Sequence, residues 1–394
     1  MINKKSDMKY RYENFGGIIS SQHPPFLAFV DRDYMRDIAD EESPLWKTED
    51  DTIGLLTAPT EVHFSITNRC SVKCQHCYMG SGNEDKDELD TRTFKKALDI
   101  LAEMNVFHIA LGGGDALERD DLFEIAAYAR GKGIVPNLTV SGVGITGAVA
   151  ERMNIFGQVN ISLDGIGSDY GIYRGNDLFQ AADDAFGNLV SAGVPAGINC
   201  VVGRRNFDLI PGIFEYASKK GLNEIEFLRL KPSGRGGLIY NKEKTTFGQN
   251  KKLTTLLAGL SAEYAIEAKI DCSFVPMFCY THPPVEMLNA FATYGCEAGN
   301  VLFGIRSNGK ISGCSFLKTS EHSVFDLAVN RHHEKGLFKE FTSWVDNASE
   351  PCASCSYLSI CKGGCHAVAE FITGDYQQPD PDCPFVIEYR KSPK

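Results

Sequence analysis

The sequence lacks the features typical of membrane proteins, secreted proteins, nucleic-acid-binding proteins and repeat proteins. No apolar run is long enough to cross a membrane, and no apolar signal core follows the charged N-terminal residues 1–7. Acidic residues outnumber basic ones by 51 to 40, for a formal net charge of −11, so no basic surface for nucleic acid is expected. No segment repeats along the chain, which argues against a solenoid. We therefore expect a cytoplasmic protein with neither a membrane nor a nucleic acid as partner.

Cysteine, by contrast, is abundant, with 13 among 394 residues. A cytoplasmic compartment keeps thiols reduced, so metal or redox chemistry explains this number better than structural disulfides. Cys70, Cys74 and Cys77 have the spacing C-x3-C-x2-C. Three thiolates can hold three irons of a cubane [4Fe-4S] cluster and leave the fourth iron free to bind a small molecule. Zinc is the alternative and would recruit His76 or a remote ligand, whereas a disulfide would leave one thiol over.

Between residues 61 and 230, short apolar runs alternate with amphipathic ones. Strands are predicted over 61–66, 106–111, 137–140, 159–163, 198–202 and 225–230, and helices over 91–104, 121–130, 179–192 and 210–219. This alternation indicates an α/β fold with a parallel sheet, and about six repeats predict a partial (β/α)6 barrel of the TIM type. Ligands of such folds lie at the C-terminal ends of the strands. The cysteine loop, the glycine run 112–115 and Asp164 all fall at those ends.

We expect four regions along the chain. The first contains two strands, 12–19 and 26–30, which flank a turn with Pro24 and Pro25. The third contains one more helix, 253–267, and the fourth is rich in loops and in cysteine. The regions are an N-terminal segment (1–60), the barrel (61–235), a bridging region (236–290) and a cysteine-rich domain (291–394).

Polar and glycine residues at the predicted strand ends are candidates for ligand binding. The run Gly112-Gly113-Gly114-Asp115 follows a strand directly, and glycine lets a ligand approach the backbone closely. An ordinary tight turn is the alternative, but the position beside the cysteine loop favours a site for an amine or a carboxylate. Ser162 and Asp164 share one face of a strand, and Arg174 could clamp the same carboxylate that Ser162 binds. For Asp164, a helix cap is the alternative role.

Seven further cysteines lie in the last hundred residues. Four of them form the run Cys352-x2-Cys355-x5-Cys361-x3-Cys365. The other three are Cys296, Cys314 and Cys383. Seven thiols fit two four-ligand clusters with one ligand missing, and one or two zinc ribbons are the alternative. Cys200 lies in the middle of a predicted strand and is expected to be a core residue without a redox role.

Together these patterns resemble the radical S-adenosylmethionine (SAM) superfamily, and within it the enzymes with a C-terminal SPASM domain. The resemblance covers roughly residues 60–394. It implies that the three-cysteine loop binds a [4Fe-4S] cluster whose open iron is occupied by the amino and carboxylate groups of SAM. In that family the cluster donates one electron, the sulfonium bond breaks, and a 5′-deoxyadenosyl radical removes a hydrogen atom from the substrate.

The resemblance also assigns SAM contacts. His76 stands where the family has an aromatic residue against the adenine. Gly113, Gly114 and Asp115 match the segment Gly-Gly-Glu-Pro that holds the methionine amine. Asp115 replaces the glutamate and Ala116 the proline, so this contact would involve the backbone alone. The remaining matches are Ser162 and Arg174, at ribose- or carboxylate-binding positions, and Leu228, at an apolar contact to the adenine.

For the C-terminal cysteines, the resemblance implies two auxiliary [4Fe-4S] clusters, three clusters in all. The first would be held by Cys296, Cys314 and Cys365. The second would be held by Cys352, Cys355, Cys361 and Cys383. Because no cysteine lies between 296 and 314, the fourth ligand of the first cluster is left open. Cys272 or Cys279 could supply it, or one iron could stay free to bind a substrate atom.

Most relatives of this type modify a peptide or a protein, by a thioether or carbon–carbon crosslink or by side-chain oxidation. We therefore expect a precursor peptide or protein as substrate and an electron donor such as flavodoxin or ferredoxin. Residues 12–38 loosely resemble the domain that grips leader peptides by strand addition, or else they cap the barrel. A small molecule such as a tetrapyrrole is the alternative substrate, and a zinc-binding interaction protein is the alternative without catalysis. Tyr173, Asp115 and Arg229 are unranked candidates for proton transfer.

Overall fold

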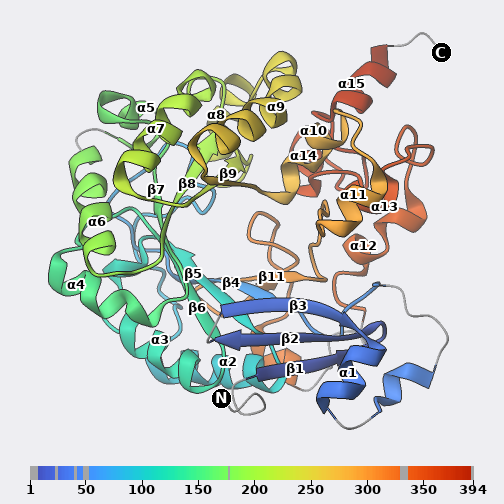
Figure 1. Cartoon of the computed structure of the whole chain (residues 1–394), viewed down its shortest axis with the longest axis horizontal. Helices are drawn as coiled ribbons and strands as arrows, with labels where there is room; N and C mark the ends of the chain where they lie inside the picture. Colours follow the sequence, from blue (N-terminus) through green and yellow to red (C-terminus); the bar gives the residue numbers. More distant parts are fainter. Residues whose placement is uncertain are drawn as a thin grey trace.

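A nine-stranded sheet lies at the centre of the fold (Figure 1). The computed structural model describes residues 8–22, 25–39, 42–47, 53–175, 178–328 and 336–391. In spatial order, the strands of the sheet are β10 (Glu267–Ile270), β9 (Glu224–Arg229), β8 (Ala196–Val202), β7 (Val159–Ser162), β6 (Val135–Val140), β5 (His108–Gly113), β4 (Glu61–Thr67), β11 (Leu302–Ile305) and β12 (Ile311–Ser312).

Strands β4 to β9 form the six-stranded parallel part that the sequence predicts. Each of them pairs in parallel with the strand that comes next along the chain. The connections contain α2 (Thr91–Glu103), α3 (Leu122–Gly131), α4 (Gly147–Arg152), α5 (Gly171–Arg174), α6 (Phe179–Ser191) and α7 (Ile210–Lys220). Figure 1 shows α2, α3, α4, α6 and α7 around the outside of the curved sheet. The predicted α/β partial barrel is confirmed, and the short helices α4 and α5 were not predicted.

Helix α2 shows why the amphipathic pattern was informative. Phe94, Ala97, Leu98 and Leu101 recur at helical spacing, and all four side chains are buried. The ring of Phe94 stacks on Phe64 of β4, with 4.1 Å between the ring centroids. Burial of each large apolar side chain stabilises the fold by about 1.5–3 kcal/mol. The helix is therefore fixed against the strand that carries the cysteine loop.

Three strands that the sequence did not indicate extend the sheet at its two ends. β10 pairs in parallel with β9, and β11 pairs in parallel with β4 on the other side, followed by antiparallel β12. The predicted helix 253–267 is displaced: α9 spans Phe247–Tyr264, and Ala265 leaves it with a φ of 53°. A capping box of Thr246 and Gln249 starts α9 earlier than the apolar pattern indicated.

The N-terminal segment is a separate three-stranded antiparallel sheet followed by helix α1 (Arg32–Ala39). Its strands are β1 (Met8–Glu13), β2 (Gly16–Gln22) and β3 (Pro25–Asp31). The predicted strand 12–19 is wrong, because a tight turn at Asn14 and Phe15 divides it between β1 and β2. Pro24 lies outside the described residues, and Pro25 begins β3.

Arg11 anchors this sheet beneath the barrel. Its guanidinium donates to the carbonyl oxygens of Ala58, Pro59 and Asn105, at 2.6, 3.0 and 3.1 Å, and these residues precede β4 and β5. Phe15 packs nearby in an apolar cluster with Phe107. The N-terminal sheet therefore covers the end of the barrel at which the parallel strands begin.

The C-terminal part consists of short helices joined by long loops, on one side of the barrel (Figure 1). Its helices, together with those of the preceding bridge, are α8 (Gly236–Glu243), α9, α10 (Val275–Cys279), α11 (Val285–Ala290), α12 (Lys339–Thr342), α13 (Leu358–Cys361), α14 (His366–Thr373) and α15 (Pro384–Lys391). Because β11 belongs to this part and pairs with β4, the cysteine-rich region is joined to the barrel through the same sheet. No helix among the described residues has the length and apolar character needed to span a membrane.

Candidate functional site

A cavity of about 840 Å³ opens inside the barrel. Its wall includes every residue that the sequence predicts around the first cluster and SAM. These are Cys70, Cys74, His76, Cys77, Gly113, Gly114, Asp115, Ser162, Arg174 and Leu228. The cavity reaches down to Gln22 and Phe26 of the N-terminal sheet, so it runs through much of the barrel. The fold thus brings together residues that are up to 158 positions apart in the sequence.

The cysteine loop is held on both sides by backbone contacts. The amide of Cys70 donates to the carbonyl of Gly82 at 2.8 Å, and the amide of Gln75 donates to the carbonyl of Tyr173 at 2.8 Å. Arg235 donates from Nε to the carbonyl of Cys74 at 2.8 Å, from the segment that follows β9. The thiols themselves are only partly buried and face the cavity. The loop is therefore fixed by its backbone, which leaves its sulfur atoms available.

Burial raises the pKa of the Cys74 thiol to about 11, although the neighbouring Arg174 acts to lower it. Cys70, Cys74 and Cys77 all border the same cavity, and the charges of Cys70 and Cys77 act on Cys74. A thiol must lose its proton to bind iron, and metal binding supplies the driving force for that loss. The cavity thus presents three thiols from one short loop.

The glycine run packs against the cysteine loop more tightly than any other residue type allows. A Cβ atom on Gly114 would lie 2.0 Å from the carbonyl oxygen of Arg69, and one on Gly113 would lie 2.5 Å from that of Thr67. Gly113 also has a φ of +110°, which side chains of L residues rarely tolerate. Gly112, in contrast, has open space around its Cβ position. Two of the three glycines therefore have a packing role in addition to any role in ligand binding.

The carboxylate of Asp115 is already engaged by the protein. It accepts from the amide of Leu117 at 3.1 Å, and from the amide of Ser141 at 3.2 Å together with the Ser141 hydroxyl. This agrees with a ligand contact through the backbone alone. The sequence analysis did not identify Ser141, although it directly follows β6 and so stands at the same end of the sheet as the other candidates.

Asp164 is the centre of a buried charge cluster. Its Oδ2 lies 2.5 Å from Nε of Arg174 and 3.1 Å from Nε2 of His76, and its Oδ1 accepts from the amide of Val201 at 2.7 Å. Burial alone would raise the pKa of Asp164, but Arg174 and His76 together bring it down to about 2. Asp164 thus forms ion pairs and does not take the alternative role of a helix cap. The His76 ring also packs against Tyr173.

Arg174 therefore has a partner before any ligand arrives. One edge of its guanidinium faces Asp164, and its Nη1 lies 4.0 Å from the sulfur of Cys74. This position beside the Cys74 thiol favours an electrostatic role for Arg174 over that of a free clamp for a carboxylate. Ser162 and Leu228 lie on β7 and β9 and line the same cavity.

The C-terminal cysteines gather in two groups. Cys296, Cys314 and Cys365 pack in one apolar cluster with Leu230 and Phe316. The other group borders a small separate cavity and consists of Cys352, Cys355, Cys361, Cys383 and, in addition, Cys279. Among the described residues, no three His, Cys, Asp or Glu side chains are arranged to hold a single metal ion. Cys200 is fully buried in β8, in keeping with a core role.

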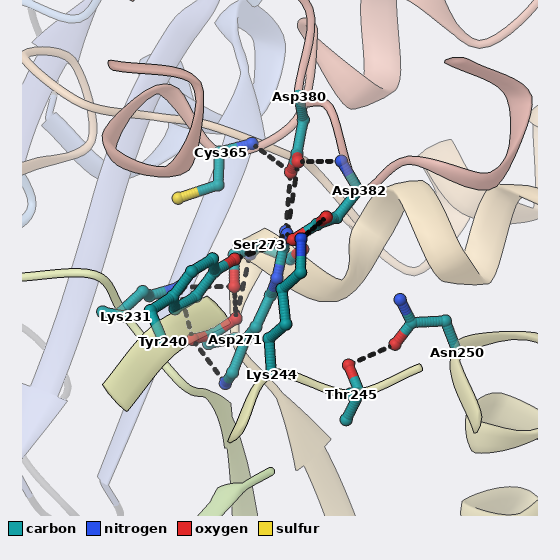
Figure 2. A network of polar contacts seen from close by, with 11 residues as sticks. Lys231, Tyr240, Lys244, Thr245, Asn250, Asp271, Ser273, Cys365, Asp380 and Asp382 are labelled. Atoms are coloured by element: carbon teal, nitrogen blue, oxygen red, sulfur yellow. Dashed lines mark hydrogen bonds and ion pairs between the residues drawn. The ribbon is translucent and has the colours of Figure 1, made fainter. Parts of the chain in front are cut away.

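A buried ionic network connects the barrel with the C-terminal part (Figure 2). Arg229, at the end of β9, donates to Asp380 at 2.6 Å and to Asp382 at 3.0 Å. Asp380 in turn accepts from the amide of Cys365 at 3.0 Å. Burial alone would lower the pKa of Arg229, but the two aspartates raise it well above its usual value. Arg229 is consequently a structural cation and not a proton donor.

The comparisons with known proteins agree with this geometry. The sequence model of the Radical SAM superfamily matches residues 64–217. The mycofactocin maturase MftC of Mycolicibacterium smegmatis is 32% identical over 343 residues, which cover 83% of each chain. The chain belongs to the radical SAM superfamily. Membership implies a [4Fe-4S] cluster and SAM as cofactors.

Other relatives in this superfamily differ in their substrates. The PqqA peptide cyclase of Ruegeria pomeroyi is 26% identical, over 83% of this chain and 87% of the relative. The Fe-coproporphyrin III synthase of Methanosarcina barkeri is 27% identical, over 82% of this chain and 87% of the relative. Among solved structures, SuiB of Streptococcus suis, bound to its precursor peptide SuiA, superposes with a TM-score of 0.72. That match covers 96% of this chain and 98% of SuiB at 15% identity, and it shows a shared fold.

Proposed function

We propose that this radical SAM enzyme modifies a precursor peptide or protein by an oxidative reaction that forms a crosslink or oxidises a side chain. The observation that carries the proposal is the combination of one cavity lined by the cysteine loop with two further groups of thiols beside it. A mycofactocin maturase and a PqqA peptide cyclase are both similar to this chain over four fifths of its length.

In this proposal Cys70, Cys74 and Cys77 hold the first cluster and leave one iron for SAM. The three cysteines border the same cavity and are only partly buried, which suits a cluster better than isolated thiols would. When bound, these cofactors would supply a 5′-deoxyadenosyl radical that removes a hydrogen atom from the substrate. Arg174 places a fixed positive charge 4.0 Å from Cys74, which offsets negative charge on the thiolates.

The glycine segment Gly113–Asp115 would present its backbone to the methionine amine, since the Asp115 side chain is already satisfied. His76, Ser162 and Leu228 would line the nucleoside end of SAM from three separate segments of the barrel. Asp164 holds His76 and Arg174 in place and excludes water from the charge cluster, because it is completely buried. These roles require no movement of the barrel strands.

We further infer two auxiliary [4Fe-4S] clusters, one at each group of C-terminal cysteines. Cys296, Cys314 and Cys365 would hold the first. Cys352, Cys355, Cys361 and Cys383 would hold the second. An oxidative modification releases a second electron, and these clusters would carry it away to an acceptor or receive electrons from a flavodoxin or ferredoxin.

The N-terminal sheet offers a site for the peptide. β3 is an edge strand, and Phe26, Leu27 and Phe29 on it are 38–41% exposed. An exposed, apolar edge strand can bind an extended peptide as an additional strand. Because Phe26 and Leu27 also line the barrel cavity, a peptide bound here would stay close to the radical site.

The test is anaerobic reconstitution followed by turnover. The proposal expects about twelve irons and twelve sulfides per chain, from three clusters. It also expects SAM-dependent 5′-deoxyadenosine and a mass loss on a peptide encoded beside the gene. Formation of 5′-deoxyadenosine with no change in any neighbouring peptide would contradict the peptide substrate.

A small molecule is the second candidate substrate, favoured by one observation. The Fe-coproporphyrin III synthase similar to this chain has a tetrapyrrole in its name, and its identity of 27% lies between the 26% of the PqqA peptide cyclase and the 32% of the mycofactocin maturase. Incubation with iron tetrapyrroles that carry more carboxyl groups than iron-coproporphyrin, under the same anaerobic conditions, separates the two candidates. SAM-dependent formation of iron-coproporphyrin would establish the second one.

A further inference from the structure

Cys272 occupies a fixed position next to the first group of C-terminal cysteines. It begins a short 3-10 turn, η6 (Cys272–Phe274), just after β10, so it stands at the same end of the sheet as the cysteine loop. Asp271 caps this turn by accepting from the amide of Ser273 at 2.9 Å. The backbone around the thiol is therefore set by the turn.

The two neighbours of Cys272 are tied to the same buried network that holds Cys365 (Figure 2). Arg229 donates from Nη1 to the carbonyl of Ser273 at 3.1 Å and to Asp380 at 2.6 Å, and Asp380 accepts from the amide of Cys365. Lys231 lies 2.9 Å from the carboxylate of Asp271 and contacts the Ser273 hydroxyl. Arg229 and Lys231 thus fix the position of Cys272 relative to Cys365.

Cys272 lies beside the first group of C-terminal cysteines. Lys231, which pairs with Asp271, directly follows Leu230, and Leu230 packs in one apolar cluster with Cys296, Cys314 and Cys365. Cys272 itself is exposed, so its thiol is accessible to a bound group. A thiol held at this position suits a ligand of a cluster at the first group of cysteines.

Cys279 points to the other group of cysteines. It ends α10, whereas Cys272 precedes that helix, and it borders the small cavity with Cys352 and Cys383. The two cysteines of the bridging region, Cys272 and Cys279, therefore belong to different groups.

We propose that Cys272 is the fourth thiolate of the first auxiliary cluster and closes the set of Cys296, Cys314 and Cys365. This inference rests on the proposed function, because it presupposes the two auxiliary clusters. A cluster with four thiolates has no free iron, so it transfers electrons and does not bind a substrate atom. Lys231, whose charge acts on Cys272 and Cys365, partly compensates for the added negative charge.

The experiment isolates the auxiliary clusters in the full chain. The variant Cys70→Ala/Cys74→Ala/Cys77→Ala serves as the background, and it is expected to hold about eight irons. Its reduced EPR spectrum is expected to stay the same when cyanide, a ligand for free iron sites, is added. With Cys272→Ala in addition, cyanide should alter the spectrum of one cluster, and oxidation should produce a three-iron signal or the loss of about four irons.

Two further variants make the result decisive. Cys279→Ala in the same background is the matched control and is expected to behave like the background. Cys272→Ser keeps the size of the side chain and an oxygen ligand, so it should retain all the iron while the spectrum of one cluster shifts. A Cys272→Ala or Cys272→Ser protein indistinguishable from the background would overturn the inference, as would a cyanide response in Cys279→Ala. A background that holds four irons or fewer would instead contradict the proposed auxiliary clusters.

Discussion

At the scale of single residues, Asp164 links the predicted parts of the site. The sequence placed it at a strand end with Ser162, but it contacts neither solvent nor the cavity and is 0% exposed. It binds Arg174 and His76, which come from two different segments of the barrel. The sequence analysis treated His76 and Arg174 as separate ligand contacts, but both are bound to the same carboxylate.

Replacement of Asp164 should destabilise the protein. In Asp164→Asn, Arg174 would be buried without its counter-charge, which costs about 3–5 kcal/mol in the free energy of unfolding. Urea unfolding of the metal-free protein in reductant measures this value. Asp169→Asn, at an exposed position five residues further on, is the control and should change it by less than about 0.5 kcal/mol. Equal effects of both variants would show that the charge cluster has no stabilising role.

The same carboxylate predicts a pH dependence. Its pKa is about 2 in the folded state, below the value of about 3.9 for an unfolded aspartate. The stabilisation is therefore complete above about pH 4 and is lost as the pH falls toward 2, by about 2–3 kcal/mol. The difference in unfolding free energy between the wild type and Asp164→Asn should shrink over this interval. A constant difference between pH 4 and pH 2 would contradict the low pKa.

The glycine run allows a matched test of backbone packing. Gly114→Ala places a Cβ against the Arg69 carbonyl, whereas Gly112→Ala meets no atom within 4 Å. We expect Gly114→Ala to lose about 1–3 kcal/mol of stability or more, and Gly112→Ala to unfold like the wild type. Thermal unfolding of both variants provides the comparison. Similar melting temperatures for the two would show that the loop yields to the extra carbon.

At the scale of elements, the N-terminal sheet is attached to the barrel by few but buried contacts. Arg11 makes an ion pair with Glu13 at 2.7 Å in addition to its three carbonyl acceptors, and both side chains are less than 7% exposed. The sheet could thus be released from the barrel without unfolding the strands β4 to β9. Whether it grips a peptide or only covers the barrel depends on how firmly it is held.

Removal of the Arg11 guanidinium should loosen this attachment. Arg11→Met removes the counter-charge of the buried Glu13 carboxylate and the donor to three carbonyls, at a cost of about 3 kcal/mol. Hydrogen exchange should then show faster opening of β1 and β2 while the barrel strands keep their protection. Arg36→Met in α1, whose ion pair with Asp33 is on the surface, should have an effect below about 1 kcal/mol. Uniform destabilisation of all strands would contradict separate opening.

At the scale of the whole molecule, Lys231 stands between the two chemical centres. It lines the barrel cavity, and its ammonium group lies 4.9 Å from the ring of Phe316. Its charge also acts on Cys314 and on Cys272. The proposed first auxiliary cluster and the proposed SAM site would therefore be neighbours across this side chain.

Loss of this charge should shift a redox potential. A positive charge favours the reduced form of a nearby cluster, so Lys231→Gln should lower the potential of the first auxiliary cluster by roughly tens of millivolts. Potentiometric EPR titration in the background without the first cluster measures the shift. Lys231→Arg keeps the charge and should restore most of the potential. An unchanged potential in Lys231→Gln would place the lysine outside the electrostatic range of the cluster.

Most of the barrel could be predicted from the sequence, because its apolar runs alternate with the period of a buried strand or of an amphipathic helix. β10, β11 and β12 could not, since they have only two to four residues, and β10 and β11 pair with strands far away in the chain. The residues around the cavity could be predicted from strand ends, cysteine spacing and the family resemblance, which alone assigned His76 and Leu228, whereas the charge cluster of Asp164 depends on tertiary contacts. The roles of these residues and the domain boundaries stay predictions.

The pairing of β4 with β11 has a consequence for synthesis of the chain. β4 carries the cysteine loop, and the strand that covers its outer edge is translated about 240 residues later. Because ribosomes add about 5–20 residues per second, the outer edge of β4 stays unpaired for roughly ten to fifty seconds before β11 is translated. During this interval the unpaired edge of the nascent barrel can pair with other chains, which leads to aggregation. The cysteine loop is still accessible to iron–sulfur delivery factors in the same interval. Rapid expression without a matching supply of clusters would then yield insoluble protein from an otherwise well-packed sequence.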